Sequence, residues 1–270
     1  MSSDFYLRHE EYERSYDYTI MKRVPIIIRA EIRNYKKLSQ NFKKPYCSEF
    51  HEVMANAMLY TITEIQDAVF GYQHNGEMTF VLRNDKEFDY EPWNQNNIQK
   101  IVSVVSSLLT LGFYKSVELF GENLNISGAG IFRVKVFAVP YLTEAINNLI
   151  LRQQECIRLA ISAAAIKELG DKLGVKTAMR ILQDSNRDEK KDLLLHHCGI
   201  DFDEYYPNSF TKGIATYKVP TIVSTKNGGT NRNKWTLNYD IPDFIEDKEF
   251  LYNILSSGVD VFRASSIGQD

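Results

Sequence analysis

Residues 68–83, AVFGYQHNGEMTFVLR, decide how the rest of the chain is arranged. Two short apolar runs rich in β-forming residues, Ala68–Tyr72 and Met78–Leu82, flank a polar turn. Asn75-Gly76 is a strong hairpin signal, because a type I′ turn needs positive φ at both central residues. We therefore predict a β-hairpin whose returning strand begins near Glu77 and presents that carboxylate at a sheet edge. A plain hairpin with a solvated glutamate is the alternative interpretation.

A second carboxylate is expected close to the first. The apolar run Val24–Ile28 predicts a buried strand, with Pro25 at its beginning, where proline is tolerated. It ends in Arg29-Ala30-Glu31. Two carboxylates from separate strands are what a site for magnesium and a nucleotide requires. Glu31 and Glu77 are therefore the candidate metal ligands and catalytic residues.

Length, composition and charge are those of an ordinary globular protein. The chain has 270 residues, 44% of them hydrophobic and 25% charged, and a net charge of −3. This balance argues against wholesale wrapping of nucleic acid but allows a local basic face. Three scattered cysteines without a Cys-x-x-Cys pair suggest neither a zinc site nor a disulfide framework. The N-terminus lacks a signal-peptide core, and no apolar run approaches about 20 residues, so we predict a cytoplasmic protein without a membrane span.

The order of elements predicts the fold class. Apolar residues at helical spacing indicate helices at Ser48–Gln66 and Asn97–Phe113, and a further strand falls within Gly128–Val139. The order strand, helix, strand, strand, helix, strand is that of a split βαβ, ferredoxin-like unit, an α+β fold that polymerase palms and nucleotide cyclases share with many proteins that are not enzymes. We expect both helices on one face of an antiparallel sheet formed by Val24–Ala30, Ala68–Tyr72, Met78–Leu82 and Arg133–Val139.

The C-terminal half is predicted to extend this unit. A long helix should run over Leu142–Leu169. We divide the chain into a palm-like domain, residues 1–141, and a helical and β extension packed on it, residues 142–270. The other elements expected there are helices at Val175–Gln183, Glu189–His197 and Phe244–Leu255, strands at Ile214–Val219, Thr221–Ser224 and Trp235–Tyr239, and a flexible basic loop at Lys226–Asn233.

Eight stretches, taken in order, resemble the tRNA-histidine guanylyltransferase family. They are residues 12–35, 42–46, 71–82, 92–113, 152–161, 199–206, 211–219 and 240–251. The closer similarity is to the bacterial and phage-type "like" branch, which extends RNA in the 3′-to-5′ direction. The resemblance implies a polymerase-like palm, two Mg²⁺ ions, GTP and ATP as substrates, the 5′ end of tRNA or another RNA as partner, and a homo-oligomer, commonly a tetramer.

The chain departs from the family where metal ligands are expected. The first metal aspartate falls on Glu31, and the second falls on Gly76 within the family's Gln-Ser-Asp-Glu turn. Losing one of two shared carboxylates leaves a site poor in charge for two divalent ions. We therefore expect at most one well-ordered Mg²⁺, held by Glu31 and Glu77. The other departures are Ile32 for a glycine, Cys47 for an aspartate of the nucleotide pocket, Phe132-Arg133-Val134-Lys135 for Phe-Asp-Ala-Arg, and Leu159 and Ala160 for asparagine and serine.

The retained polar positions imply binding roles. The resemblance implies nucleotide and phosphate contacts for Arg29, Arg33, Lys44, Asn75, Gly76, Lys100, Ser103 and Lys212, and RNA contacts for Arg152, Gln153 and Arg158. We expect Arg158 to be partly buried and either paired with a carboxylate or aimed into the palm cleft. Two hypotheses remain: a working nucleotidyltransferase, and a catalytically degenerate member that binds RNA or nucleotide or partners an active relative.

Overall fold

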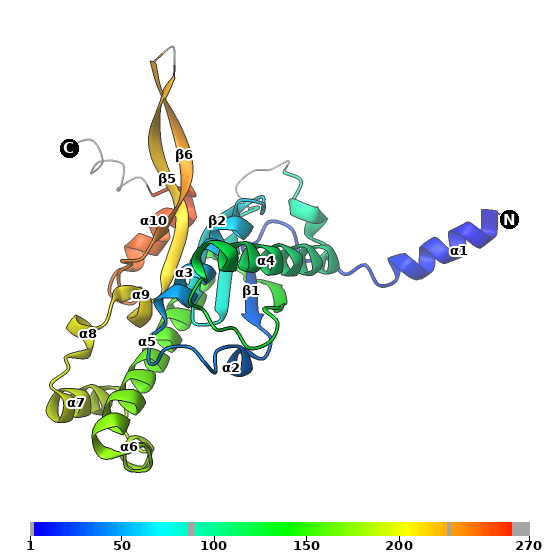
Figure 1. The fold of residues 1–270 in the computed structure, drawn as a ribbon. Coiled ribbons are helices and arrows are strands. Elements are labelled where there is room, and N and C mark those ends of the chain that lie inside the picture. Colours follow the sequence, from blue (N-terminus) through cyan, green and yellow to red (C-terminus); the bar gives the residue numbers. More distant parts are fainter. Residues whose placement is uncertain (1–2, 86–89, 226–227, 261–270) are drawn as a thin grey trace.

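A six-stranded antiparallel sheet in the order β4-β1-β3-β2-β5-β6 forms the centre of the molecule (Figure 1). The computed structural model describes residues 3–85, 90–225 and 228–260, and only the backbone of residues 222–225 and 228–231. The order β4-β1-β3-β2 and its antiparallel pairing confirm the predicted ferredoxin-like palm. The strands are β1 (Ile26–Ile32), β2 (Ala68–His74), β3 (Glu77–Leu82), β4 (Phe132–Ala138), β5 (Ile214–Thr225) and β6 (Gly228–Asn238).

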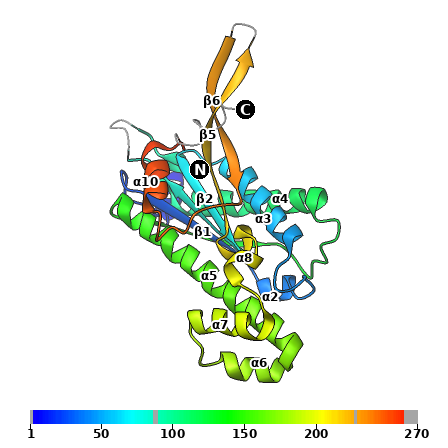
Figure 2. The same cartoon turned by 90° about the vertical axis from the view of Figure 1, so that its left-hand side faces the viewer.

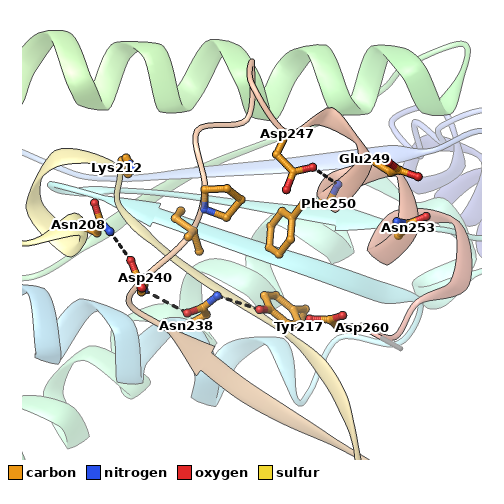
Figure 3. Close-up of a pocket in the computed structure, with 12 residues that line it drawn as sticks. Asn208, Lys212, Tyr217, Asn238, Asp240, Asp247, Glu249, Phe250, Asn253 and Asp260 are labelled. Atoms are coloured by element: carbon orange, nitrogen blue, oxygen red, sulfur yellow. Dashed lines mark hydrogen bonds between the residues drawn. The ribbon is translucent and has the colours of Figure 1, made fainter. Parts of the chain in front are cut away.

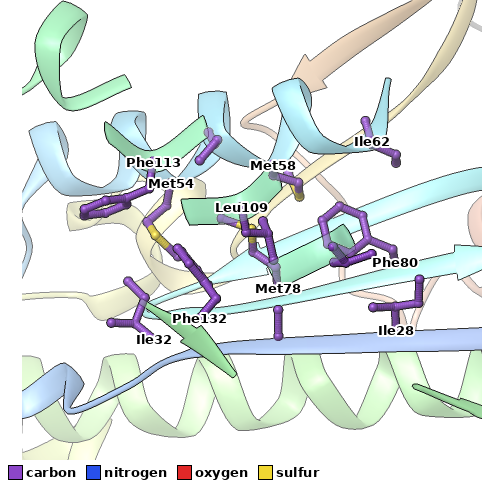
Figure 4. Close-up of a cluster of buried hydrophobic side chains, with 14 of the residues drawn as sticks. Ile28, Ile32, Met54, Met58, Ile62, Met78, Phe80, Leu109, Phe113 and Phe132 are labelled. Carbon is purple, nitrogen blue, oxygen red and sulfur yellow. The ribbon is translucent and has the colours of Figure 1, made fainter. Parts of the chain in front are cut away.

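Two helices cover one face of the sheet, as predicted. They are α3 (Ser48–Ile62) and α4 (Ile98–Phe120). Their apolar stripes pack on alternate residues of the strands, because successive side chains of a strand point to opposite faces. Figure 4 shows Met54 and Met58 of α3 and Leu109 and Phe113 of α4 in this core, against Phe80 of β3.

The opposite face is covered by helices from the C-terminal half. The long helix α5 (Leu142–Leu173) and α10 (Lys248–Ser257) bury a second cluster that includes Ile27, Phe70 and Val81. Ile27 belongs to this cluster whereas its neighbours Ile26 and Ile28 belong to the first, so β1 is apolar on both faces. The predicted helix at Phe244–Leu255 begins later, at Lys248, because Asp247 caps it by accepting a hydrogen bond from the Phe250 amide.

The far half of α5 carries a small helical lobe (Figure 2). Its third cluster joins α5 to the short helices through residues such as Ala164, Leu194 and Phe202. The lobe consists of α6 (Val175–Leu182), α7 (Arg187–Cys198), α8 (Phe202–Tyr205) and α9 (Asn208–Thr211). Outside it lie α1 (Ser3–Arg14), which projects away from the body in Figure 1, α2 (Tyr35–Leu38) and the 3-10 turn η1 (Trp93–Asn96).

Strands β5 and β6 form one long ribbon that extends beyond the rest of the sheet (Figure 1). The predicted break at Pro220 and the predicted loop from residue 228 to 233 are both wrong, while Lys226 and Asn227 lie outside the described residues. Strand β2 pairs with β5 only as far as Tyr217. Beyond that point β2 no longer pairs with β5, although the Asp260 amide donates to the Lys218 carbonyl, and a proline on this unpaired edge removes no ladder hydrogen bond.

The central sheet bears on the predicted domain boundary and on the predicted end of the second helix. Because β5 pairs with β2, a single sheet crosses the predicted boundary between residues 141 and 142. Helix α4 extends seven residues past the predicted end at Phe113. Within the described part of the chain it alone has the length and composition of a membrane-spanning helix, and it packs on α3 and the sheet.

Candidate functional site

The fold places the two predicted carboxylates side by side. Glu31 of β1 lies directly opposite Glu77 of β3 in the antiparallel register. Residues opposite one another in such a pair have Cβ atoms about 5 Å apart. Both glutamates share the strand face of Ile27 and Val81, which α5 covers, but they lie toward the hairpin end of the sheet. The sheet register therefore brings together two residues that lie 46 positions apart in the sequence.

Arginines surround this glutamate pair. Glu77 Oε2 accepts hydrogen bonds from Arg29 Nη2 at 2.6 Å and Nε at 3.0 Å. Arg152 of α5 brings Nη1 to 3.8 Å from the same oxygen. Glu31 Oε1 pairs with Arg133 Nη2 of β4 at 2.9 Å. Like charges directly opposite each other destabilise a sheet, and these three guanidinium groups compensate the two carboxylates.

The residues present do not fit a magnesium centre. Magnesium needs oxygen ligands in near-octahedral geometry, and two-metal sites need carboxylates that bridge the ions. Here both carboxylates are already ion-paired, and Gly76 has no side chain to offer. Among the described residues, no group of three or more His, Cys, Asp or Glu could hold a metal ion. The expectation that Glu31 and Glu77 hold Mg²⁺ is not supported, because one oxygen of each carboxylate, Glu31 Oε1 and Glu77 Oε2, is paired with a guanidinium group.

A cavity of about 380 Å³ opens beside the glutamate pair. It brings together five of the predicted site residues: Glu31, Lys44, Asn75, Gly76 and Glu77. One wall is apolar, formed by Leu159, Ala163 and Phe210. The rest of the lining consists of Ile32, Tyr35, Lys36, Pro45 and His74. Apolar and aromatic walls with a few polar groups and lysines are the usual lining of a site for a nucleobase and its phosphates.

His74 is a residue of this cavity whose role the sequence reasoning missed. Its side chain is 2% exposed, and neither ring nitrogen has a hydrogen-bond partner among the described residues. Burial, with the nearby Arg152 guanidinium as a smaller cause, lowers its pKa to about 3. The imidazole is therefore neutral. Its proximity could have been inferred from the hairpin, because His74 lies directly opposite Glu77.

Several predicted phosphate contacts lie elsewhere. None of Arg33, Lys100, Ser103 and Lys212 lines the cavity beside the glutamates. Lys100 and Ser103 are exposed on α4, which covers the other face of the sheet. Lys212 offers its backbone carbonyl to Tyr72 Oη at 2.8 Å and its side chain to a different cavity. The family motif preserved these residue types, but the fold does not gather them at one point.

The three expected RNA contacts, Arg152, Gln153 and Arg158, all lie on α5, but their environments differ from one another. Gln153 is fully buried: its Nε2 donates to the Pro242 carbonyl at 2.9 Å, and its Oε1 accepts from the Phe244 amide at 2.6 Å. These hydrogen bonds hold the segment before α10 against α5, so the Gln153 side chain is not available to RNA. Arg158 is exposed, not partly buried, and pairs with Glu155 at 2.6 Å, which confirms only the expected carboxylate partner. Arg152 is the arginine that reaches the palm, with its side chain 17% exposed.

A cavity of about 730 Å³ lies at the base of the ribbon (Figure 3). Its polar side chains largely bind one another. Asn238 donates to Tyr217 Oη at 2.9 Å, the Asp240 amide donates to Asn238 at 3.1 Å, and Asn208 donates to Asp240. Of the predicted site residues it contains Lys212 alone. These groups therefore hold the two strands of the ribbon together and join the segment after β6 to α9.

The turn at Gly76 differs from the predicted type I′ geometry. Asn75 adopts a φ of 47°, but Gly76 lies outside the left-handed region. Space explains the glycine instead: a Cβ at this position would lie 2.7 Å from Cδ2 and 3.0 Å from Cγ of Tyr35. The Tyr35 ring is itself packed on Phe50. An aspartate here would therefore displace the ring before it could bind a metal.

We expect Gly76→Ala and Gly76→Asp to destabilise the protein by a similar amount, about 1–3 kcal/mol, because overpacking a fixed ring is the common cause. Urea unfolding measures this free energy. In the Tyr35→Leu background the same two substitutions should cost at least about 1 kcal/mol less. An equal cost in both backgrounds would show that Tyr35 is not the obstacle.

Comparisons with known proteins agree with this architecture. The family profile Thg1, described as tRNAHis guanylyltransferase, matches residues 6–140. The curated tRNA(His) guanylyltransferase 1 of Arabidopsis thaliana is 23% identical over 213 residues, which are 77% of this chain but only 36% of that protein. The chain thus spans about a third of that relative's length.

Solved structures share the fold over nearly their whole length. A bacterial tRNA(HIS) guanylyltransferase (Thg1)-like protein in complex with ATP has a TM-score of 0.75 and 22% identity, covering 92% of this chain and 97% of its own. The bacterial Thg1-like protein in complex with GTP has a TM-score of 0.69 and 20% identity, and the match covers 94% of this chain and 99% of that one. The tRNA(His) guanylyltransferase of Saccharomyces cerevisiae has a TM-score of 0.69 and 18% identity, and the match covers 87% of this chain and 98% of that one. With the family profile matched over half the chain and the palm topology in place, this protein belongs to the Thg1, tRNAHis guanylyltransferase, family.

Proposed function

We propose that this protein binds a nucleoside triphosphate, GTP or ATP, and the 5′ end of an RNA such as tRNA in its palm, and that nucleotidyl transfer is slow or absent. Family membership supports the ligand classes, and relatives of the same fold are described in complex with ATP and GTP. The cavity beside the glutamates, with its apolar wall and Lys36 and Lys44, suits a nucleotide.

The observation that carries this proposal is the state of the two carboxylates. Both Glu31 and Glu77 are ion-paired with arginines, and the position of the family's second metal aspartate is Gly76. Phosphoryl transfer depends on positioning and on compensation of charge in the transition state, normally by metal ions held on carboxylates. The palm retains arginines and lysines that can bind phosphate, but among its described residues no group of three or more His, Cys, Asp or Glu could hold a metal ion. Binding is therefore better supported than turnover.

A second candidate is active transfer, the addition of nucleotides to RNA 5′ ends in the 3′-to-5′ direction. The direct opposition of Glu31 and Glu77 across β1 and β3 favours it, because the scaffold of a metal site is in place. It requires the arginines to release the carboxylates and a partner subunit to supply a further ligand. We also propose a homo-oligomer, tetrameric by family resemblance, which light scattering on the purified chain would measure.

The two candidates separate in one experiment on the purified chain. We expect calorimetry to detect binding of GTP or ATP. We also expect labelled nucleotide to be added to a 5′-activated tRNA no faster with the protein than without it. Glu31→Gln, which removes the carboxylate charge but keeps the side-chain length, should not change that background. Robust addition that Glu31→Gln abolishes would establish the transferase instead. Addition that ignores the substitution would indicate a contaminating enzyme.

A further inference from the structure

A second cavity, of about 430 Å³, lies beside the glutamate pair on the side of the edge strand β4. Its charged lining consists of Arg29 and Glu31 from β1 and Arg133 and Lys135 from β4. The register explains this grouping, since Arg29 lies opposite Lys135 and Glu31 lies opposite Arg133. Val102 and Ser106 of α4 and the side chains of Phe132 and Val134 complete the lining. Four charged groups are thus fixed at one place by two neighbouring strands.

The lining of this cavity is cationic. Three basic side chains against one carboxylate, +3 and −1, leave a net charge of +2. Lys135 is exposed and makes no ion pair or hydrogen bond among the described residues. Arg133 is paired with Glu31, with Nη2 at 2.9 Å from Oε1, and its side chain is 66% exposed. These two cations can therefore reorient toward a ligand without breaking a buried network.

The charge distribution selects the class of ligand. A divalent cation entering here would meet three positive side chains, and its nearest carboxylate already binds a guanidinium group. A polyanion would meet the exposed guanidinium fork of Arg133, whose planar donors match phosphate oxygens, and the ammonium group of Lys135. Arg29 is held by Glu77 at its Nε and Nη2 atoms, which fixes the orientation of its guanidinium group and leaves Nη1 for a ligand. The cavity therefore suits a chain of phosphates better than a metal ion.

We propose that this cavity is a triphosphate site that works without a divalent cation, with Arg29, Arg133 and Lys135 in place of the metal. The inference rests on the proposed function, since the triphosphate belongs either to the nucleotide or to an RNA 5′ end. On binding, Arg133 exchanges its contact with Glu31 for one with phosphate. Arginine in place of the family carboxylate at residue 133 then does more than remove a carboxylate. It replaces a group that attracts cations with one that binds phosphate.

Calorimetry on the full-length chain tests the site with defined probes. Inorganic tripolyphosphate and GTP should bind in EDTA with dissociation constants within about threefold of those in Mg²⁺, because no metal bridge is involved. RNA with a 5′-triphosphate is compared with the same RNA carrying a 5′-hydroxyl. Tighter binding of the triphosphorylated RNA assigns the site to the RNA end, and equal binding of the two RNAs assigns it to the nucleotide.

Variants identify the contacts. Arg133→Gln and Lys135→Gln should each weaken tripolyphosphate binding about tenfold, the usual effect of losing one charge-assisted contact. Arg180→Gln, which removes an equal charge from exposed helix α6, should leave it unchanged. The double variant Arg133→Gln/Glu31→Gln removes both members of one ion pair and should stay weakened. Recovery to wild-type affinity would show that Glu31 repels the anion and that Arg133 does not bind it, which overturns the assignment.

Failure of this inference differs from failure of the proposed function. If GTP binds only in Mg²⁺ and Glu31→Gln abolishes that binding, the metal-free site is wrong and the proposed nucleotide binding stands. If GTP binds in EDTA but Arg133→Gln and Lys135→Gln have no effect, the triphosphate lies elsewhere and the inference is again wrong. If neither GTP nor ATP binds under either condition, the proposed function itself fails. Thermal unfolding of each variant confirms that the protein compared is folded.

Discussion

Replacing Gly213 with alanine should lower the free energy of unfolding by about 3 kcal/mol or more, one of the largest effects expected from a single methyl group here. Gly213 has a φ of +87°, a left-handed conformation that costs an L-residue about 1–2 kcal/mol. A Cβ would also lie 2.6 Å from Tyr72 Oη and 2.7 Å from the Gln73 carbonyl oxygen. The carbonyl belongs to β2, which is paired on both sides, so the backbone cannot easily move away.

A matched control separates the two causes. Gly199 also has a left-handed φ, +69°, but nothing lies within 4 Å of its added Cβ. Gly199→Ala should therefore cost only the conformational part, about 1 kcal/mol. Urea denaturation at neutral pH gives both values. The Gly213→Ala/Tyr72→Phe variant relieves the hydroxyl contact and should recover part of the loss. If Gly213→Ala lowers the free energy of unfolding no more than Gly199→Ala does, the close approach of Gly213 to β2 does not exclude a side chain at this position.

Mild acid should destabilise the protein strongly through two buried histidines. Burial lowers the pKa of His74 to about 3 and that of His51 to about 4. Besides burial, Arg152 and Arg29 contribute to this lowered pKa of His74, and Glu155 opposes it. His51 faces His74, which lowers the pKa of His51 in turn. Both imidazoles are therefore neutral in the folded state across the neutral range.

The sign of the pH effect follows from these lowered pKa values. An unfolded histidine takes up a proton near pH 6.5, whereas the folded residues resist protonation until about pH 3 or 4. The stabilisation is complete above pH 6.5 and is lost as the pH falls below it, because the unfolded state binds more protons. Between pH 7 and pH 5 we expect a loss of about 4 kcal/mol in the free energy of unfolding.

Substitution distinguishes these histidines from general acid effects. His74→Gln should reduce the slope of unfolding free energy against pH over this range by about half, since one of the two protonation sites is removed. His197→Gln, at an exposed position of α7, should leave the slope unchanged. Unfolding in urea at several pH values measures the slope. An unaltered slope in His74→Gln would mean that His74 is not the residue that titrates.

The sequence by itself determined the palm and much of its core. Apolar residues at helical spacing in Ser48–Gln66 and Asn97–Phe113, together with the hairpin around Asn75, predicted the order of elements and the face that both helices cover. These features depend on local spacing: a period of 3.6 residues marks a helix face, and a period of 2 marks a strand face. The eight family stretches likewise indicated the family correctly.

Only the tertiary structure decided which polar groups meet. That Arg133 compensates Glu31 depends on the register of β1 against β4, which lie about a hundred residues apart, and a shift of one residue would turn Arg133 to the other face. Arg152 and Arg158 both lie on α5, yet one reaches Glu77 and the other faces solvent. Gln153, implied as an RNA contact, is buried because the segment before α10 passes over it. Ion pairs and burial depend on neighbours that are distant in sequence, so residue type and spacing predicted the scaffold but not the state of its carboxylates.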